Sequence, residues 1–123
     1  MYIMKSSRHP TELDLSQMNR NAPVLDPQAM RAAAGQAVGA LKLLANEDRL
    51  LLLCQLALGE MCVGELEAAL DIRQPTLSQQ LGVLRSEAVV QTRRQGKNIY
   101  YRIADPALPQ ILALLHRLYC PRD

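Results

Sequence analysis

The sequence predicts a mostly α-helical domain with one β-hairpin, in the order α-α-α-α-β-β-α. Apolar residues make up 49% of the 123 residues, but Phe and Trp are absent, so the core must be built from Leu, Ala and Val. This composition suits helices more than a β-sandwich. Apolar side chains recur at three- and four-residue steps in several segments, whereas two short β-prone runs lie between residues 89 and 103.

Two helices are expected in the first half of the chain. Asp26 and Pro27 provide an N-cap and a first-turn proline for a helix over residues 27–44, in which small residues permit the close approach of another helix. Asn46 caps the next helix, which ends at Gly59. Leucines cover nearly the whole circumference of this second helix, and such a pattern indicates a buried helix.

The N-terminal segment differs from the rest of the chain. Residues 1–25 mix Ser, Asn, His, Pro and charges without sustained periodicity, so we expect a flexible arm with a helical turn near residues 13–18. Residues 26–120 are expected to form one domain. No run of about 18 apolar residues and no apolar core of a secretory signal are present, so we expect no membrane partner and a cytoplasmic location.

Residues 63–85 have the pattern of two helices joined by a tight turn. The apolar positions with helical spacing are Leu66 and Leu70 in the first helix and Leu77, Leu81 and Leu84 in the second. Asp71 can adopt the left-handed backbone of a helix exit, Ile72 can lie under the turn, and Pro75 is tolerated in a first turn. This pattern is typical of a helix-turn-helix, whose second helix enters the DNA major groove.

A hairpin and a last helix follow. The β-prone runs 89–94 and 98–103 flank Gln95-Gly96-Lys97, whose glycine supplies the positive φ that such turns require. A last helix is expected from Pro106 to about Tyr119. Helix-turn-helix, hairpin and helix together define a winged helix. Because the first and last helices carry more apolar side chains than one small domain needs, we expect a homodimer formed through these two helices.

The charge is unevenly distributed. Residues 73–102 contain six basic side chains and one acid, so this segment carries +5, and the rest of the chain carries −3 because the total is +2. Beside a helix-turn-helix, a basic segment indicates double-stranded DNA as the partner. Without that motif, a solvated charged surface would be the better interpretation.

The side chains expected to contact DNA lie on the second helix of the motif and on the hairpin. Gln79 is the main candidate for direct base contact, since Gln can bind adenine through two hydrogen bonds, and Val83 can meet a thymine methyl. Basic hairpin residues would contact phosphates or the minor groove. The full set of candidates is Gln74, Thr76, Ser78, Gln79, Gln80, Val83, Arg85, Arg93, Arg94 and Lys97. For Gln79 and Gln80, the alternative is a solvated helix surface without a role in binding.

From Leu43 to Cys120 the chain resembles the ArsR family of bacterial winged-helix repressors. The resemblance is carried by LLANEDRLLLL, VGELEAALDIRQPTLSQQLGVLR, VVQTRRQGKNIYYRI and the closing helix. Asp71 stands where Gly is usual and Arg73 where a capping Ser is usual, so Arg73 can replace a cap with a phosphate contact. The resemblance implies a dimeric repressor that leaves its operator when an inducer binds.

The metal sites of the family are incomplete in this sequence. Cys62 matches the first cysteine of the arsenic-type site, but Gly64 replaces the second. Asp105 and His116 match part of the zinc-type site, but Ala107 stands where its first His is needed. We therefore expect no resident metal and no cofactor.

A metal-responsive repressor stays as the alternative function. It would use Cys62 together with His9 of the arm or with Cys120 of a second copy.

The other two cysteines resemble those of the thiol-responsive branch of the family, which includes regulators of biofilm growth, sulfur oxidation and haemolysin production. This resemblance implies that Cys54 and Cys120 form a disulfide or polysulfide within one subunit, induced by reactive sulfur species or oxidants, and that the bridge weakens operator binding. Leucines around Cys54 should raise its pKa, so Cys120 is expected to react first and Cys54 to resolve it.

Two alternatives to thiol sensing stay open. Cys54 can be a small buried hydrophobe and Cys120 a frayed terminal thiol. A thiol enzyme is a remote alternative, because the sequence has neither a CxxC pair nor a convincing Cys–His–acid arrangement, so no enzymatic activity is expected.

Overall fold

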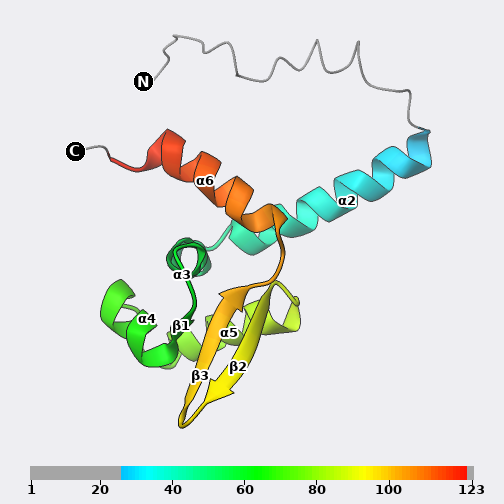
Figure 1. Ribbon diagram of the computed structural model, residues 1–123. Coiled ribbons are helices and arrows are strands. Elements are labelled where there is room, and N and C mark those ends of the chain that lie inside the picture. Colours follow the sequence, from blue (N-terminus) through cyan, green and yellow to red (C-terminus); the bar gives the residue numbers. More distant parts are fainter. Residues whose placement is uncertain (1–25, 122–123) are drawn as a thin grey trace. The chain divides into compact units, whose positions relative to one another are not determined.

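The computed structural model describes residues 26–121, so the expected arm and its helical turn lie outside the described residues. The elements are α2 (Pro27–Leu44), α3 (Glu47–Ala57), β1 (Met61–Cys62), α4 (Val63–Leu70), α5 (Thr76–Ser86), β2 (Val90–Gln95), β3 (Asn98–Ile103) and α6 (Ala107–Tyr119) (Figure 1). The predicted order of helices and hairpin is confirmed, with one short strand added. In this part of the chain no helix is long and apolar enough to cross a membrane.

The chain divides into two units, Met1–Gly35 and Gln36–Asp123. The described part of the first unit is the beginning of α2, where the Asp26 carboxylate accepts a hydrogen bond from the N–H of Ala29 at 2.9 Å, as expected of an N-cap. The second unit contains the end of α2 and all the other elements.

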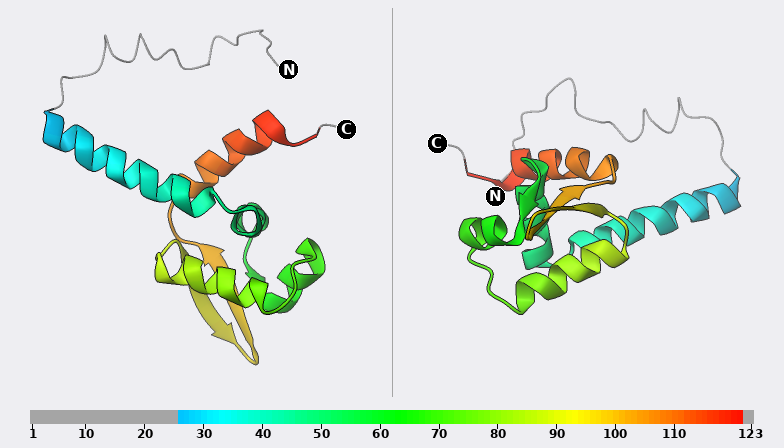
Figure 2. Two further views of the ribbon diagram at one scale, coloured as in Figure 1. Left: turned by 180° about the vertical axis from the view of Figure 1, so that it is seen from behind. Right: turned by 60° about the horizontal axis from the view of Figure 1, so that its bottom comes forward.

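Helix α3 is the centre of the larger unit. It contacts α4, α5, α6 and β3, and Figures 1 and 2 show it between α6 on one side and α4 and α5 on the other. Leu52 and Leu53 are fully buried, and Leu56 is nearly so. The prediction of burial all round is wrong, however, because Leu51 is 44% exposed and Leu58, at the C-cap, is 79% exposed. The elements packed against α3 leave that side of the helix uncovered.

Local capping signals act as the sequence indicates. The Asn46 side chain accepts a hydrogen bond from the backbone N–H of Arg49 at 3.0 Å and so caps α3. Asp71 ends α4 in the left-handed region, with φ of +53°, and the buried Ile72 follows under the turn. Gly59 has φ of +155° just after α3. These residues set the angle at which each helix enters the next.

The helix-turn-helix is held by its leucines. Leu66 of α4 is fully buried, and so are Leu77 and Leu84 of α5, with Leu81 only 2% exposed. Arg73 stands where a capping Ser is usual, and its neighbour Gln74 supplies the missing acceptor. The Gln74 side-chain oxygen accepts a hydrogen bond from the backbone N–H of Ser78 at 3.2 Å. The inward side of α5 is thus fixed, and its opposite side faces outward.

The hairpin belongs to a three-stranded antiparallel sheet with the order β1-β3-β2. The added strand β1 pairs Met61 with Tyr101, and two residues are too few for a strand period to be visible in the sequence. Gln95 is the last residue of β2 and pairs with Asn98, so the turn is one residue shorter than predicted. Gly96 has φ of +61°, which confirms the predicted role of the turn glycine.

Candidate DNA-binding surface and thiol pair

The outward side of α5 presents a small polar surface. Gln79 and Arg85 are exposed, and within residues 26–121 the Gln79 side chain makes no hydrogen bond, so both its donor and its acceptor are available to a base. Thr76 and Val83 are half-buried, and Val83 packs against the core. Contact between Val83 and a thymine methyl is thereby limited to the exposed part of its side chain.

Three of the DNA contacts expected on α5 and just before it are already engaged inside the protein. The Ser78 hydroxyl donates to the side-chain oxygen of Gln74, which also caps the helix. The side-chain oxygen of Gln80 accepts a hydrogen bond from Arg49 Nη1 at 3.0 Å. The fold therefore orients these side chains before DNA is present.

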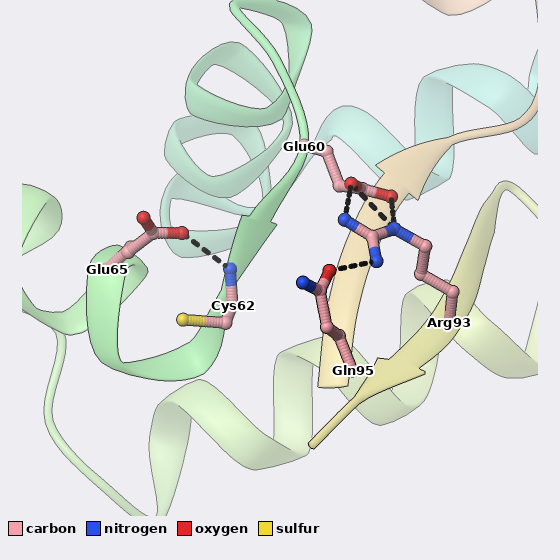
Figure 3. A network of polar contacts seen from close by, with 5 residues as sticks. All are labelled: Glu60, Cys62, Glu65, Arg93 and Gln95. Atoms are coloured by element: carbon pink, nitrogen blue, oxygen red, sulfur yellow. Dashed lines mark hydrogen bonds and ion pairs between the residues drawn. The ribbon is translucent and has the colours of Figure 1, made fainter. Parts of the chain in front are cut away.

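Arg93 lies in a network on the hairpin, drawn in Figure 3. Its Nε donates to both carboxylate oxygens of Glu60 at 2.9 Å, its Nη2 donates to one of them at 2.7 Å, and its Nη1 donates to the Gln95 side-chain oxygen at 2.6 Å. The guanidinium also lies 4.7 Å from the centre of the Tyr100 ring, which is directly opposite on β3. Sequence reasoning missed Glu60, since nothing local connects it with β2.

The ion pair with Glu60 sets the charge of the hairpin around Arg93. The hydrogen bond from Arg93 is the main cause that lowers the pKa of the Glu60 carboxyl; partial burial opposes it, and the charges of Arg93 and Arg102 add to it. Glu60 thus stays ionised and neutralises Arg93 in the free protein. A DNA phosphate would have to displace Glu60 before it could bind this guanidinium, so we expect Arg93 to contribute less to phosphate binding than the sequence alone predicts.

Two further basic residues lie at the tip of the hairpin. Arg94 and Lys97 are exposed, and within the described part of the chain their side chains make no ion pair. Their charges are free to meet phosphates, which bind through charge rather than base identity.

The three cysteines are free thiols in different surroundings. Cys54 is half-buried on α3, and Cys120 is exposed at the C-cap of α6. Burial raises the pKa of the Cys54 thiol, and the negative charge of a Cys120 thiolate raises that pKa further. The second effect requires the two thiols to lie within range of each other's charge. The buried Cys62 is the N-cap of α4, where its N–H donates to the Glu65 carboxylate at 3.0 Å (Figure 3).

The described residues provide no set of metal ligands around Cys62, which the alternative of a metal-responsive repressor would need. Among residues 26–121, no three His, Cys, Asp or Glu side chains gather in a group that could hold a metal ion. Asp105, which matches a zinc-site position, instead accepts a hydrogen bond from the N–H of Ala107 at 2.9 Å and caps α6. His9 lies outside the described residues.

Residues 46–92 match the family described as bacterial regulatory protein, arsR family. The biofilm growth-associated repressor of Agrobacterium fabrum is 52% identical over 92 residues, which are 75% of this chain and 79% of that protein. The chain belongs to the ArsR family. It is therefore a DNA-binding transcriptional repressor with a winged helix-turn-helix, and its relatives are regulators rather than enzymes.

Solved structures agree with this assignment to the ArsR family. The transcriptional repressor BigR from Xylella fastidiosa is 42% identical, with a TM-score of 0.73 over 80% of this chain and 100% of that one. Reduced HlyU from Vibrio cholerae is 40% identical, with a TM-score of 0.72 over 76% of this chain and 99% of that one.

In this ArsR-family repressor, Arg94→Gln or Lys97→Gln is expected to lower the salt dependence of DNA binding. Each lost phosphate contact should reduce the slope of log K against log salt concentration by about 0.9. Arg93→Gln should leave the slope nearly unchanged, because Glu60 already neutralises that guanidinium. Glu60→Gln is the matched variant: it frees Arg93 and should raise the slope by about 0.9.

Fluorescence anisotropy with an operator fragment, selected from a random-sequence library, measures these slopes. If Arg93→Gln lowers the slope as much as Lys97→Gln does, DNA displaces Glu60 and the network does not shield Arg93.

Alkylation of Cys54 by iodoacetamide is expected to accelerate at a higher pH than that of an ordinary thiol, because only the thiolate reacts and both causes raise the pKa of Cys54. Cys120→Ser removes the smaller cause, so the profile should shift to lower pH but stay above that of an ordinary thiol. Mass spectrometry of proteolytic peptides follows the alkylation of Cys54 separately from that of Cys62 and Cys120. An unchanged profile in the Cys120→Ser protein would place the two thiols beyond each other's electrostatic influence.

Proposed function

We propose that this chain is a homodimeric repressor that leaves its operator when Cys54 and Cys120 become joined by a disulfide or polysulfide. The packing of α3, which carries Cys54, against α6, which ends at Cys120, carries the proposal. The negative charge of Cys120, which adds to burial in raising the pKa of Cys54, supports it. The similarity to BigR and to reduced HlyU over most of the chain supports the same assignment.

A persulfide, RSSH, can supply the oxidation. The Cys120 thiolate attacks its sulfane sulfur, which releases RSH and leaves Cys120–SSH. The Cys54 thiolate then attacks the Cys120 sulfur, which forms the disulfide and releases H₂S. The sum is RSSH + 2 CysSH → CysSSCys + RSH + H₂S, and a second RSSH yields the trisulfide with one more RSH. Peroxide would reach the same disulfide through a sulfenic acid, with release of two water molecules.

Exposure and ionisation favour this order of events. Cys120 is exposed at a helix end and can meet a dissolved persulfide, whereas Cys54 is half-buried. The raised pKa of Cys54 leaves it mostly protonated at neutral pH, so it is a poor first nucleophile. It is suited to the second step, in which its partner is held nearby and a small thiolate fraction is enough.

The bridge would act on DNA binding through α3. A covalent bond to the end of α6 constrains α3, and α3 packs directly against the recognition helix α5. A change in the position of α3 therefore alters the support of α5. In a dimer, this would change the spacing of two recognition helices, which must meet successive major grooves about 34–36 Å apart.

The homodimer is supported by apolar side chains that the single chain leaves uncovered on α2 and α6. Leu41 on α2 is 62% exposed, and Leu118 and Tyr119 on α6 are 63% and 79% exposed. Val38 and Leu114 lie on the same two helices and are also exposed. A second copy that covers both helices would remove this apolar surface from water.

Treatment of reduced protein with glutathione persulfide is expected to weaken operator binding by roughly 5- to 150-fold, the usual size of coupling between two sites. The Cys120→Ser and Cys54→Ser proteins should keep their affinity, and Cys62→Ser should respond as the wild type does. Fluorescence anisotropy gives the affinities, and intact-mass measurement gives the bridge. Loss of affinity in Cys120→Ser protein equal to that of the wild type would refute the dithiol mechanism.

Leu41→Glu or Leu118→Glu is expected to convert the dimer to a monomer and to weaken operator binding, because each places a charge on the proposed interface. Leu58→Glu is the matched control: this leucine is also exposed, at 79%, but lies outside α2 and α6. Sedimentation velocity gives the oligomeric state. Dimers that survive in both interface variants would place the interface elsewhere.

A further inference from the structure

One side chain, Arg49, joins three elements of the domain. Its Nε donates to the carbonyl oxygen of Leu43 at 2.8 Å, and its Nη2 donates to that of Lys42 at 3.2 Å. Its Nη1 donates to the side-chain oxygen of Gln80 at 3.0 Å. The end of α2, the first turn of α3 and the recognition helix α5 therefore meet at one half-buried guanidinium.

The guanidinium is held in place from two sides. The Asn46 side chain binds the backbone N–H of Arg49, which fixes the residue at the start of α3. The carbonyl groups of Lys42 and Leu43 belong to the last turn of α2, where carbonyls lack partners within the helix and where the helix dipole favours a cation. Arg49 thus gives the Leu43 carbonyl a donor and adds a second one to the Lys42 carbonyl, which also accepts a hydrogen bond from the Ala45 N–H at 3.3 Å. These bonds keep Arg49 next to Gln80.

Arg49 also determines which group of the Gln80 side-chain amide remains free to bind another molecule. A guanidinium donates five hydrogens and accepts none, so it must face the amide oxygen rather than the amide nitrogen. The Gln80 Nε2 group is therefore the end available to another molecule, and it makes no hydrogen bond within residues 26–121. Neighbouring Gln79 is not held in this way.

We propose that Arg49 is a positioning residue: it occupies the Gln80 side-chain oxygen, so that Gln80 can only donate a hydrogen bond to the operator. This proposal rests on base contact by α5, as in the proposed function, and is independent of the thiol bridge. Binding of adenine through both N6 and N7 needs a donor and an acceptor on the same amide. With its oxygen occupied, Gln80 instead donates to one acceptor: N7 or O6 of guanine, N7 of adenine or O4 of thymine.

The test compares four reduced proteins: wild type, Arg49→Met, Gln80→Met and the double variant. Fluorescence anisotropy measures their affinity for the selected operator and for a set with each base pair changed singly. Gln80→Met is expected to relax discrimination at one base pair by roughly tenfold. Arg49→Met should relax it at the same base pair, and the double variant should be no worse than either single one. Gln79→Met, the matched control, should act at a different base pair.

Two conservative variants keep the proposal testable if Arg49→Met does not fold. Gln80→Glu retains an acceptor for Arg49 but has no amide donor, so it should keep the melting temperature and lose the preference at that base pair. Arg49→Lys keeps the charge but lacks the rigid guanidinium that reaches three acceptors. It should therefore reduce discrimination at the same base pair less than Arg49→Met does.

A uniform loss of affinity across all operator variants would show a merely structural role for Arg49 and overturn the proposal. Additive effects, or effects at separate base pairs, would also overturn it. Because every protein is reduced, failure of the persulfide response would count against the proposed thiol switch and leave this result unaffected.

Discussion

The burial of three leucines on α3 is the contact on which the rest of the domain depends. Leu52, Leu53 and Leu56 lose nearly all their exposure, and each contributes roughly 1.5–3 kcal/mol relative to an exposed leucine. Because α3 touches α4, α5, α6 and β3 together, these side chains hold the recognition helix, the sheet and the last helix in one arrangement. A displacement of α3 would therefore disturb its contacts with all four elements at once.

The elements could be predicted because their signals are local. The spacing of Leu77, Leu81 and Leu84 identifies the inner side of α5 without any knowledge of the partners that bury it. Asn46 and Asp71 act within a single turn of chain, so their roles as a cap and as a left-handed helix exit follow from residue type. Membership of the ArsR family rests on the same local patterns taken in order.

The contacts that refine the binding surface could not be predicted, because they join residues that only the fold brings together. From charge alone, Arg93, Arg94 and Lys97 are equally good candidates for phosphate contacts. Of these three, only Arg93 is neutralised by Glu60. The two-residue strand β1 carries no period of its own, yet it places Glu60 beside the hairpin. Likewise, helical angle puts Gln80 at the border of the outward side of α5, and only the position of Arg49 reveals that its oxygen is taken.

Arg49 and Cys54 share α3, and this gives the proposed switch a physical route. The two residues are five positions apart, or about 7.5 Å along the axis at 1.5 Å per residue, with buried leucines between them. A bond that pulls Cys54 toward α6 must therefore displace Arg49 as well, since the helix between them cannot bend without opening the core. Arg49 would then withdraw from Gln80, and the amide would be free to rotate. In this view the bridge changes both where α5 lies and which base edge its Gln80 can bind, so weaker binding and poorer discrimination arise from one movement.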